Sequence, residues 1–287
     1  MTTQLFPAGR VLHRSFSIRC YATARPSQPK RPRRAEAAVP PPVEPQVVYE
    51  NEQVLVLNKP AGVALQGVHG SAQRLAWDQL LDAIRKRDGC AQASPVHRLD
   101  KATTGCLVLS KTPVHAARLT KQIQQRAFSK DYLAVVHGQI KEGFESEVDA
   151  PLRMDGDRVR VAEDGVEAKT RWECLSSSKS FSLLRLKPST GRKHQLRVHC
   201  ADVLQVAAPI VGDFKIAPSA PHASALSDIS LPFSTLLLHA SSVSFFAWEK
   251  TGKRYTISAS APPPPSFLRF CKAHKLQIPV AEPVKEV

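Results

Sequence analysis

The order of apolar segments between residues 47 and 260 most limits what this chain can fold into. Short runs at 47–50, 54–57 and 106–110 have the length and composition of β-strands. Two longer segments, 75–87 and 113–126, place apolar residues at helical spacing. Strands and helices follow one another without a regular βαβ period, which predicts an α+β fold with a mixed sheet.

Further elements complete this prediction. We expect a strand at 128–138, short strands separated by turns between 145 and 186, and strands at 236–239, 243–246 and 254–258. A helix is expected at 194–204. Residues 217–234 are rich in Pro, Ser and Ala and predict a surface loop.

The composition divides the chain into three parts. Residues 22–46 are rich in Pro, Ala and Arg, which is typical of a linker. We therefore expect a leader and linker at 1–45 and one main domain at 46–262. Prolines 262–265 are expected to end the packed part and leave a tail at 263–287.

The first 35 residues predict a mitochondrial presequence. They contain eight Lys and Arg residues, several hydroxyl residues and no Asp or Glu. No apolar core of a secretory signal is present in them, so secretion is not expected. The prediction is import into the mitochondrial matrix, and the alternative is a basic tail that contributes to binding a polyanion.

The net charge of +15 favours a polyanionic partner: RNA, DNA or an anionic membrane surface. Without the first 35 residues, 32 basic residues face 25 acidic ones, so the remainder is still basic, by +7. No apolar run approaches the roughly 18 residues of a membrane helix, so no membrane span is expected.

The six cysteines predict neither a disulfide framework nor a metal centre. None of them forms a Cys-x-x-Cys pair. His194, His199 and Cys200 are close in sequence, but their spacing matches no common zinc motif. We therefore expect reduced, mostly structural thiols and no bound metal.

A carboxylate motif lies directly before the 106–110 strand. His97-Arg98-Leu99-Asp100 is followed by Lys101-Ala102-Thr103-Thr104-Gly105. An Asp at the mouth of a strand can serve as a nucleophile or a general base. The alternative is an Asp that only caps a turn or a helix.

Two later segments add to this motif: Lys130-Asp131-Tyr132-Leu133-Ala134, and residues 190–199, which begin Thr190-Gly191-Arg192 and include Arg197. Together with 58–62, 209–213 and 237–240, these segments resemble the motifs of RluA-type pseudouridine synthases in the same order. The resemblance covers about residues 47–260.

The resemblance implies a largely antiparallel central sheet with flanking helices and an isomerase that converts uridine to pseudouridine in RNA. That reaction breaks the C1′–N1 bond and joins C1′ to C5 without redox change, so no cofactor is implied. Asp100 would be the essential carboxylate, which either attacks C1′ or removes a ribose proton.

The resemblance also assigns roles to other residues. Tyr132 would stack on uracil or help to move the C5 proton, although it could be an ordinary strand tyrosine. Arg197 would be the ion-pair partner of Asp100; Arg192 is the alternative partner, and Arg197 could instead bind phosphate. Substrate contacts are expected from Lys59, Arg98, Arg192, His194 and Gln195, with Arg98 holding or replacing a flipped nucleotide.

The substrate expected from these observations is mitochondrial RNA, first large-subunit ribosomal RNA and second transfer RNA, bound by a monomer. One alternative is a catalytically silent RNA-binding or ribosome-assembly protein with the same fold. Another is a glycoside hydrolase, but such enzymes normally need a second carboxylate, and no comparable motif supplies one.

Overall fold

The structure is a computed structural model that describes residues 44–67, 74–203, 208–280 and 284–286, all within one compact unit, Val39–Val287. Most of the predicted presequence and linker therefore lies outside the described residues. The strands are β1 (Val47–Glu50), β2 (Val54–Lys59), β3 (Ser94–Pro95), β4 (Thr104–Ser110), β5 (Ser129–His137), β6 (Glu145–Asp149), β7 (Leu152–Asp155), β8 (Arg158–Val161), β9 (Lys169–Ser177), β10 (Phe181–Pro188), β11 (Leu238–Trp248), β12 (Arg254–Ser260) and β13 (Lys285–Glu286). The helices are α1 (Leu75–Arg85), α2 (Pro113–Gln124), α3 (Gln195–Val198), α4 (His222–Ser227) and α5 (Pro265–Ala273), with a π-helix at His199–Val203.

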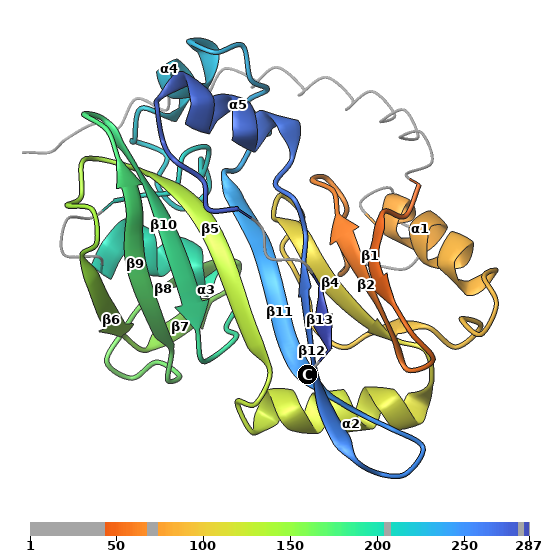
Figure 1. Cartoon of the computed structure of the whole chain (residues 1–287). Coiled ribbons are helices and arrows are strands. Elements are labelled where there is room, and N and C mark those ends of the chain that lie inside the picture. Colours follow the sequence, from red (N-terminus) through yellow and green to blue (C-terminus); the bar gives the residue numbers. More distant parts are fainter. Residues whose placement is uncertain (1–43, 68–73, 204–207, 281–283, 287) are drawn as a thin grey trace, which may run out of the picture. The chain divides into compact units, whose positions relative to one another are not determined.

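The main sheet runs in the order β1-β2-β4-β11-β5-β10-β9-β6 (Figure 1). Strand β12 extends β11, β13 extends β12, and β3 pairs with β4, while β7 and β8 form a separate hairpin. Among the described strand pairs, β4–β11 is parallel and the others are antiparallel. The α+β fold with a mixed, largely antiparallel sheet is therefore confirmed.

The β4–β11 pair is a narrow seam in the sheet. Gly105 has φ +106°, and a Cβ atom built on it would lie 2.2 Å from the carbonyl oxygen of Ala240. Only glycine permits so close an approach of two backbones. Beside it, the Thr104 hydroxyl donates to Nδ1 of His239 at 2.8 Å, and His239 Nε2 donates to the Ala261 carbonyl at 2.9 Å.

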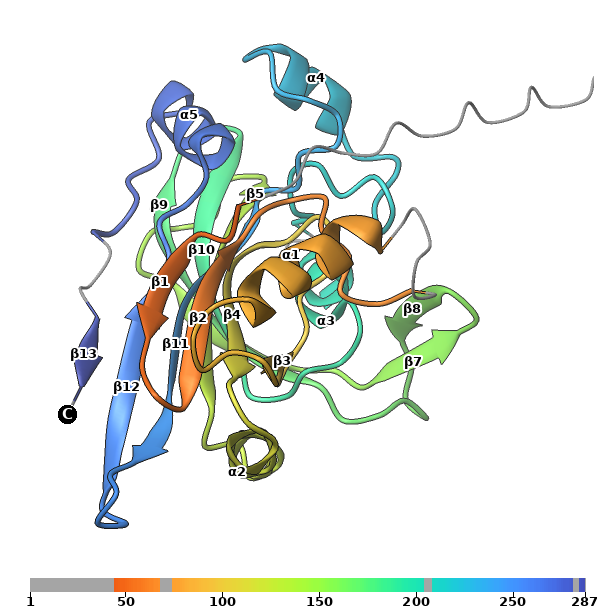
Figure 2. The ribbon, with the colours of Figure 1, turned by 90° about the vertical axis from the view of Figure 1, so that its right-hand side faces the viewer.

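Alternating side chains of β5 build a separate core on each face of the sheet. Tyr132, Ala134 and Val136 belong to the cluster that also contains the buried residues of α1. Leu133 and Val135 belong to the cluster that contains Phe267 and Phe270 of α5. Figures 1 and 2 show α5 on one face of the sheet, and α1, α2 and α3 on the other.

The helix predicted at 194–204 has a different form. The α-helical part covers only Gln195–Val198, and a π-helix continues to Val203. His199, where the π-helix begins, hydrogen-bonds through both ring nitrogens, with the Thr170 hydroxyl at 3.0 Å and the Ala150 carbonyl at 3.1 Å. The two bonds anchor the wider turn to neighbouring segments, and π-turns of this kind are frequent at functional sites.

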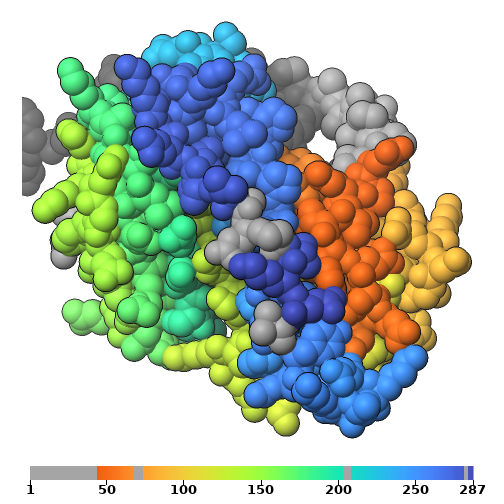
Figure 3. All heavy atoms as spheres, viewed as in Figure 1, coloured from red at the N-terminus to blue at the C-terminus, as the bar shows by residue number. Residues whose placement is uncertain are grey.

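The prediction that the packed part ends near residue 262 is wrong. Helix α5 begins at Pro265 and buries Phe267 and Phe270 against the sheet, where it covers part of the face seen in Figure 3. Proline at the first helical position is favourable, so this proline run starts a helix. The loop predicted at 217–234 contains α4, and the two strands predicted between 236 and 246 are the single strand β11.

Candidate active site

One pocket of about 240 Å³ gathers most of the residues selected from the sequence. It opens on the α1–α2 face of the sheet, between the loop before β4, the strand β5 and the segment that leads into α3. Its lining includes Arg98, Asp100, Tyr132, Arg192, His194, Gln195 and Arg197.

Asp100 provides the carboxylate of this pocket. It lies in the loop between β3 and β4, where its carbonyl accepts a hydrogen bond from the Thr103 amide at 3.2 Å. Its side chain is 18% exposed, and Oδ2 accepts a hydrogen bond from Arg197 Nη1 at 3.0 Å. The carboxylate is thus oriented by a cation and still reachable from the pocket.

Arg197 is held by two carboxylates. Its Nε and Nη2 donate to Asp213 at 2.7 and 2.6 Å, and its Nη1 donates to Asp100. Burial disfavours the charged form, but the hydrogen bonds and charges of Asp213 and Asp100 outweigh it and raise the pKa of Arg197. The bidentate pairing with Asp213 fixes the plane of the guanidinium, and the remaining Nη1 is directed at Asp100.

His194 lies beside this pair in a strained conformation. It precedes α3 with φ +55°, a left-handed backbone that a non-glycine residue adopts at a cost. Its Nε2 lies 3.8 Å from Asp100 Oδ2, and its Nδ1 is buried without a hydrogen-bond partner. Burial lowers the pKa of His194 to about 4 despite the opposing charge of Asp100, so the ring is neutral at pH 7.

Tyr132 extends from the middle of β5 into the pocket and is 8% exposed. Burial, followed by the charge of Asp100, raises its pKa above the ordinary value, so the phenol keeps its proton at neutral pH. A protonated, mostly buried ring suits stacking on a base.

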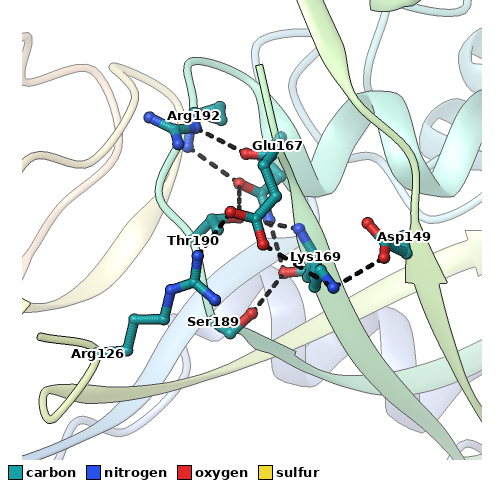
Figure 4. A network of polar contacts seen from close by, with 8 residues as sticks. Arg126, Asp149, Glu167, Lys169, Ser189, Thr190 and Arg192 are labelled. Carbon is teal, nitrogen blue, oxygen red and sulfur yellow. Dashed lines mark hydrogen bonds and ion pairs between the residues drawn. The ribbon is translucent and has the colours of Figure 1, made fainter. Parts of the chain in front are cut away.

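The turn at residues 189–192 forms one rim of the pocket and is tied to the start of β9 (Figure 4). The Ser189 amide donates to the Lys169 carbonyl at 3.1 Å, and the Lys169 amide donates to the Thr190 hydroxyl at 2.9 Å. Arg192 Nε donates to the Glu167 carbonyl at 2.9 Å. These bonds hold the rim in one place relative to the sheet.

Gln195, for which a substrate contact is predicted, lines the pocket, and its side-chain amide also belongs to this support. Its Nε2 donates to the Lys169 carbonyl and the Thr170 hydroxyl, at 2.9 and 3.0 Å. Its Oε1 accepts from the Thr190 hydroxyl and the Arg192 amide, at 2.8 and 3.0 Å. The side-chain amide therefore has four protein partners and positions the rim.

The position of Lys59 contradicts the prediction that this residue contacts the RNA backbone. The residue is fully buried, and its Nζ donates to the carbonyls of Pro60, Val63 and Lys101 at 2.8, 3.0 and 3.3 Å. Burial lowers its pKa to about 7, against the opposing charge of Asp100. Lys59 ties the turn after β2 to the residue that follows Asp100.

Arg98 and Arg192 are the exposed cations at the pocket. Their positions suit contacts with an anionic strand, and their roles stay predictions. No group of three or more potential metal ligands occurs in the part of the chain that the structure describes, and no helix there is long and apolar enough to cross a bilayer.

Comparison with known proteins agrees with this geometry. Residues 53–202, just over half of the chain, match the family model described as RNA pseudouridylate synthase. The chain belongs to this family. The RluA-type resemblance of its motifs is thereby confirmed, and members of this family isomerise uridine to pseudouridine in RNA.

Relatives of this pseudouridine synthase family member include bacterial and organellar proteins. Ribosomal large subunit pseudouridine synthase D of Pseudomonas aeruginosa is 34% identical over 187 residues, which are 62% of this chain and 57% of that protein. RNA pseudouridine synthase 4, mitochondrial, of Arabidopsis thaliana is 35% identical over 195 residues, 59% of this chain and 40% of that protein. The chain thus spans less than two thirds of both relatives.

A solved structure supports the family fold. Human RNA pseudouridylate synthase domain containing 4 superposes with a TM-score of 0.64 at 25% identity, and the match covers 82% of this chain and 95% of that one.

Two site residues of this family member, Asp213 and His97, were not selected from the sequence. Asp213 orients Arg197, and its place after Gly212 in the 209–213 motif was the available signal. Lys130, for which the sequence left a backbone contact and a solvated surface charge as alternatives, lines the pocket, and burial lowers its pKa. His97 accepts a hydrogen bond from the Val108 amide at 3.0 Å, and burial lowers its pKa to about 3.

Proposed function

We propose that this chain isomerises uridine to pseudouridine in mitochondrial RNA, with large-subunit ribosomal RNA as its substrate. One observation carries the activity: Asp100, held by Arg197 and facing the same pocket as Tyr132. A carboxylate, a fixed cation and an aromatic ring in one pocket are what isomerisation of a flipped base requires.

The chemistry starts with cleavage of the C1′–N1 bond. Asp100 either attacks C1′ or removes a ribose proton, and both routes need the ionised carboxylate that Arg197 stabilises. The detached uracil turns on the ring of Tyr132 and forms the C1′–C5 bond. The proton of C5 is then lost, N1 gains a proton, and the product has the composition of the substrate.

The substrate and compartment rest on other observations. The basic, acid-free residues 1–35 support import into mitochondria, and so does the organellar relative from Arabidopsis. The relative from Pseudomonas is named for the large ribosomal subunit, which favours that RNA over transfer RNA.

An intact Asp100–Arg197 pair favours catalysis over a silent RNA-binding role. The direct test measures tritium released from C5 when the full chain is incubated with large-subunit ribosomal RNA containing 5-tritiated uridine. Asp100→Asn is expected to abolish release. Asp131→Asn is the matched control, because Asp131 precedes Tyr132 and is paired with Lys187 at 3.6 Å, outside the pocket lining.

Release by the native chain that survives in Asp100→Asn would exclude Asp100 as the essential carboxylate. No release by the native chain from either ribosomal or transfer RNA, with RNA binding retained, would favour the silent role. Carbodiimide mapping of pseudouridine in total mitochondrial RNA from cells that carry Asp100→Asn then tests compartment and position. Unchanged modification there would exclude a mitochondrial RNA substrate.

A further inference from the structure

A second cleft, of about 350 Å³, lies between α2 and the end of β11, outside the pocket of Asp100. Its lining includes three exposed cations, Arg118, Lys121 and Arg254, and two aromatic residues, Phe246 and Trp248. No carboxylate is among the residues that line it. We call it the α2–β11 cleft.

The two arginines of the cleft are ordered by aromatic rings. The guanidinium carbon of Arg118 lies 5.0 Å from the ring centre of Trp248, and that of Arg254 lies 4.0 Å from the ring centre of Phe246. Within the described residues, neither arginine forms an ion pair. A ring orders a guanidinium without neutralising it, so its N–H groups stay available to a phosphate.

Helix α2 lies between this cleft and the active-site pocket. Ile123 lines the pocket of Asp100, and Lys121, two residues earlier and therefore on the opposite side of the helix, lines the cleft. Between them, the buried Gln122 donates to the Phe246 carbonyl at 2.8 Å and accepts from the Phe246 amide at 2.7 Å. Figures 1 and 3 show α2 beside the hairpin that joins β11 to β12.

The hairpin beyond the cleft is more mixed in charge. It carries Lys250 and Lys253 but also Glu249, and Lys250 is paired with Glu52 at 3.6 Å. Arg118 and Arg254 also line the neighbouring cleft beside this hairpin, whose lining includes Glu52, Glu249 and Glu286. Lys121 lines the α2–β11 cleft but not this neighbour, and no carboxylate is among the residues that line the α2–β11 cleft.

We propose that the α2–β11 cleft binds the RNA strand that flanks the target uridine, with phosphates contacting Arg118, Lys121 and Arg254. This inference rests on the proposed function. The three cations that line the cleft, without a carboxylate among the lining residues, favour a polyanionic ligand. The cleft and the base pocket lie on opposite sides of α2, one helix diameter of about 10 to 12 Å apart, a span that a few nucleotides cross. This proximity favours the strand that carries the target over an acidic protein surface.

The test compares two variants of the full chain that lose equal charge. The first carries Arg118→Gln, Lys121→Gln and Arg254→Gln. The control carries Lys179→Gln, Arg269→Gln and Lys272→Gln, three exposed cations on the β9–β10 turn and on α5. Fluorescence anisotropy measures binding of oligouridines of about 3 and about 20 nucleotides over a series of salt concentrations.

The cleft variant is expected to bind the longer strand about tenfold more weakly. Its plot of log affinity against log salt should flatten by about 2, since each phosphate contact with a single strand contributes about 0.7. Its binding of the shorter strand should match that of the native chain, and the control should leave both affinities unchanged.

Equal affinities and slopes of the cleft and control variants for the long strand would overturn the proposal and leave a different anionic partner for the cleft. Equal losses for both strand lengths would also overturn it, because the contact would not lie on the flank. Cleft-dependent binding without any tritium release would contradict only the proposed activity.

Discussion

Arg197 and Asp213 form a buried, bidentate ion pair, with N–O distances of 2.6 and 2.7 Å. The remaining Nη1 of the guanidinium donates a hydrogen bond to Asp100. Asp213 is 2% exposed, and its Oδ1 also accepts from the Ile216 amide at 3.2 Å. The catalytic carboxylate that we propose is therefore oriented by a second carboxylate outside the pocket lining.

Asp213→Asn should lower the free energy of unfolding by about 3 kcal/mol, because the buried guanidinium loses the charge that compensates it. The turnover rate should fall at least about tenfold while the dissociation constant for RNA changes little, because Arg197 no longer has a fixed plane. Urea unfolding, tritium release and RNA binding together measure the three quantities.

Asp100→Asn is the matched comparison for Asp213→Asn. Asp100 is partly exposed, and Arg197 keeps Asp213, so the loss of stability should stay below about 1 kcal/mol. Equal destabilisation by the two substitutions would contradict the view that Asp213 is the main anchor of Arg197.

Gln195→Ala should destabilise the fold by about 2 to 3 kcal/mol, because the buried partners of the amide lose their hydrogen bonds. Arg192→Gln, three residues earlier, should change stability by less than about 0.5 kcal/mol and weaken RNA binding in a salt-dependent manner. Chemical unfolding and anisotropy would reveal the reverse pattern if Gln195 were the substrate contact.

Gly105→Ala should destabilise the protein by more than about 4 kcal/mol or prevent folding, because the new methyl group would meet the Ala240 carbonyl. Gly143 offers a matched control, with φ +73° and no atom within 4 Å of an added Cβ. Gly143→Ala should lose only about 1 to 2 kcal/mol, the cost of a left-handed backbone. Similar thermal unfolding of both variants would argue against a tight seam.

Acid should weaken the fold through His239. Burial lowers its folded-state pKa to about 4, whereas the unfolded value is about 6.5. The unfolded chain therefore binds the proton more readily, and the stability present above pH 6.5 is lost as the pH falls towards 4. For this one residue the loss from pH 7 to pH 5 is about 2 kcal/mol.

The measurement for His239 is guanidinium unfolding of the native chain and of His239→Gln at both pH values. The loss of stability on acidification should be smaller in the variant by about 2 kcal/mol. An identical loss in both proteins would assign the acid sensitivity to other groups, such as His97, His137 and His194, whose pKa values are also lowered by burial.

The sequence predicted the elements that local patterns determine. Helices α1 and α2 and strands β1, β4 and β5 appear within a few residues of their expected bounds, because their apolar spacing and flanking turns are local signals. Helix α5 was missed because prolines 262–265 were interpreted as the end of the packed part, whereas the last of them, Pro265, is the first residue of the helix.

The site was predictable only in part for a similar reason. Motifs of one carboxylate, one tyrosine and one arginine pointed to Asp100, Tyr132 and Arg197, which the fold brings together. Whether a polar side chain faces a ligand or the backbone depends on tertiary contacts. Lys59 and Gln195 both have the chemistry of a substrate contact, yet both satisfy buried backbone groups.

The seam of the sheet has a consequence for the pocket. Ala240 is the partner of Gly105 on one side and of Tyr132 on the other, and the loop of Asp100 runs directly into β4. The distance between the Asp100 carboxylate and the Tyr132 ring therefore depends on strand β11, which lies between β4 and β5. It also depends on the close approach of β4 to β11, which is possible because Gly105 has no side chain. The sheet itself thus sets the distance between the carboxylate and the stacking ring, and a single methyl group added at Gly105 would change that distance.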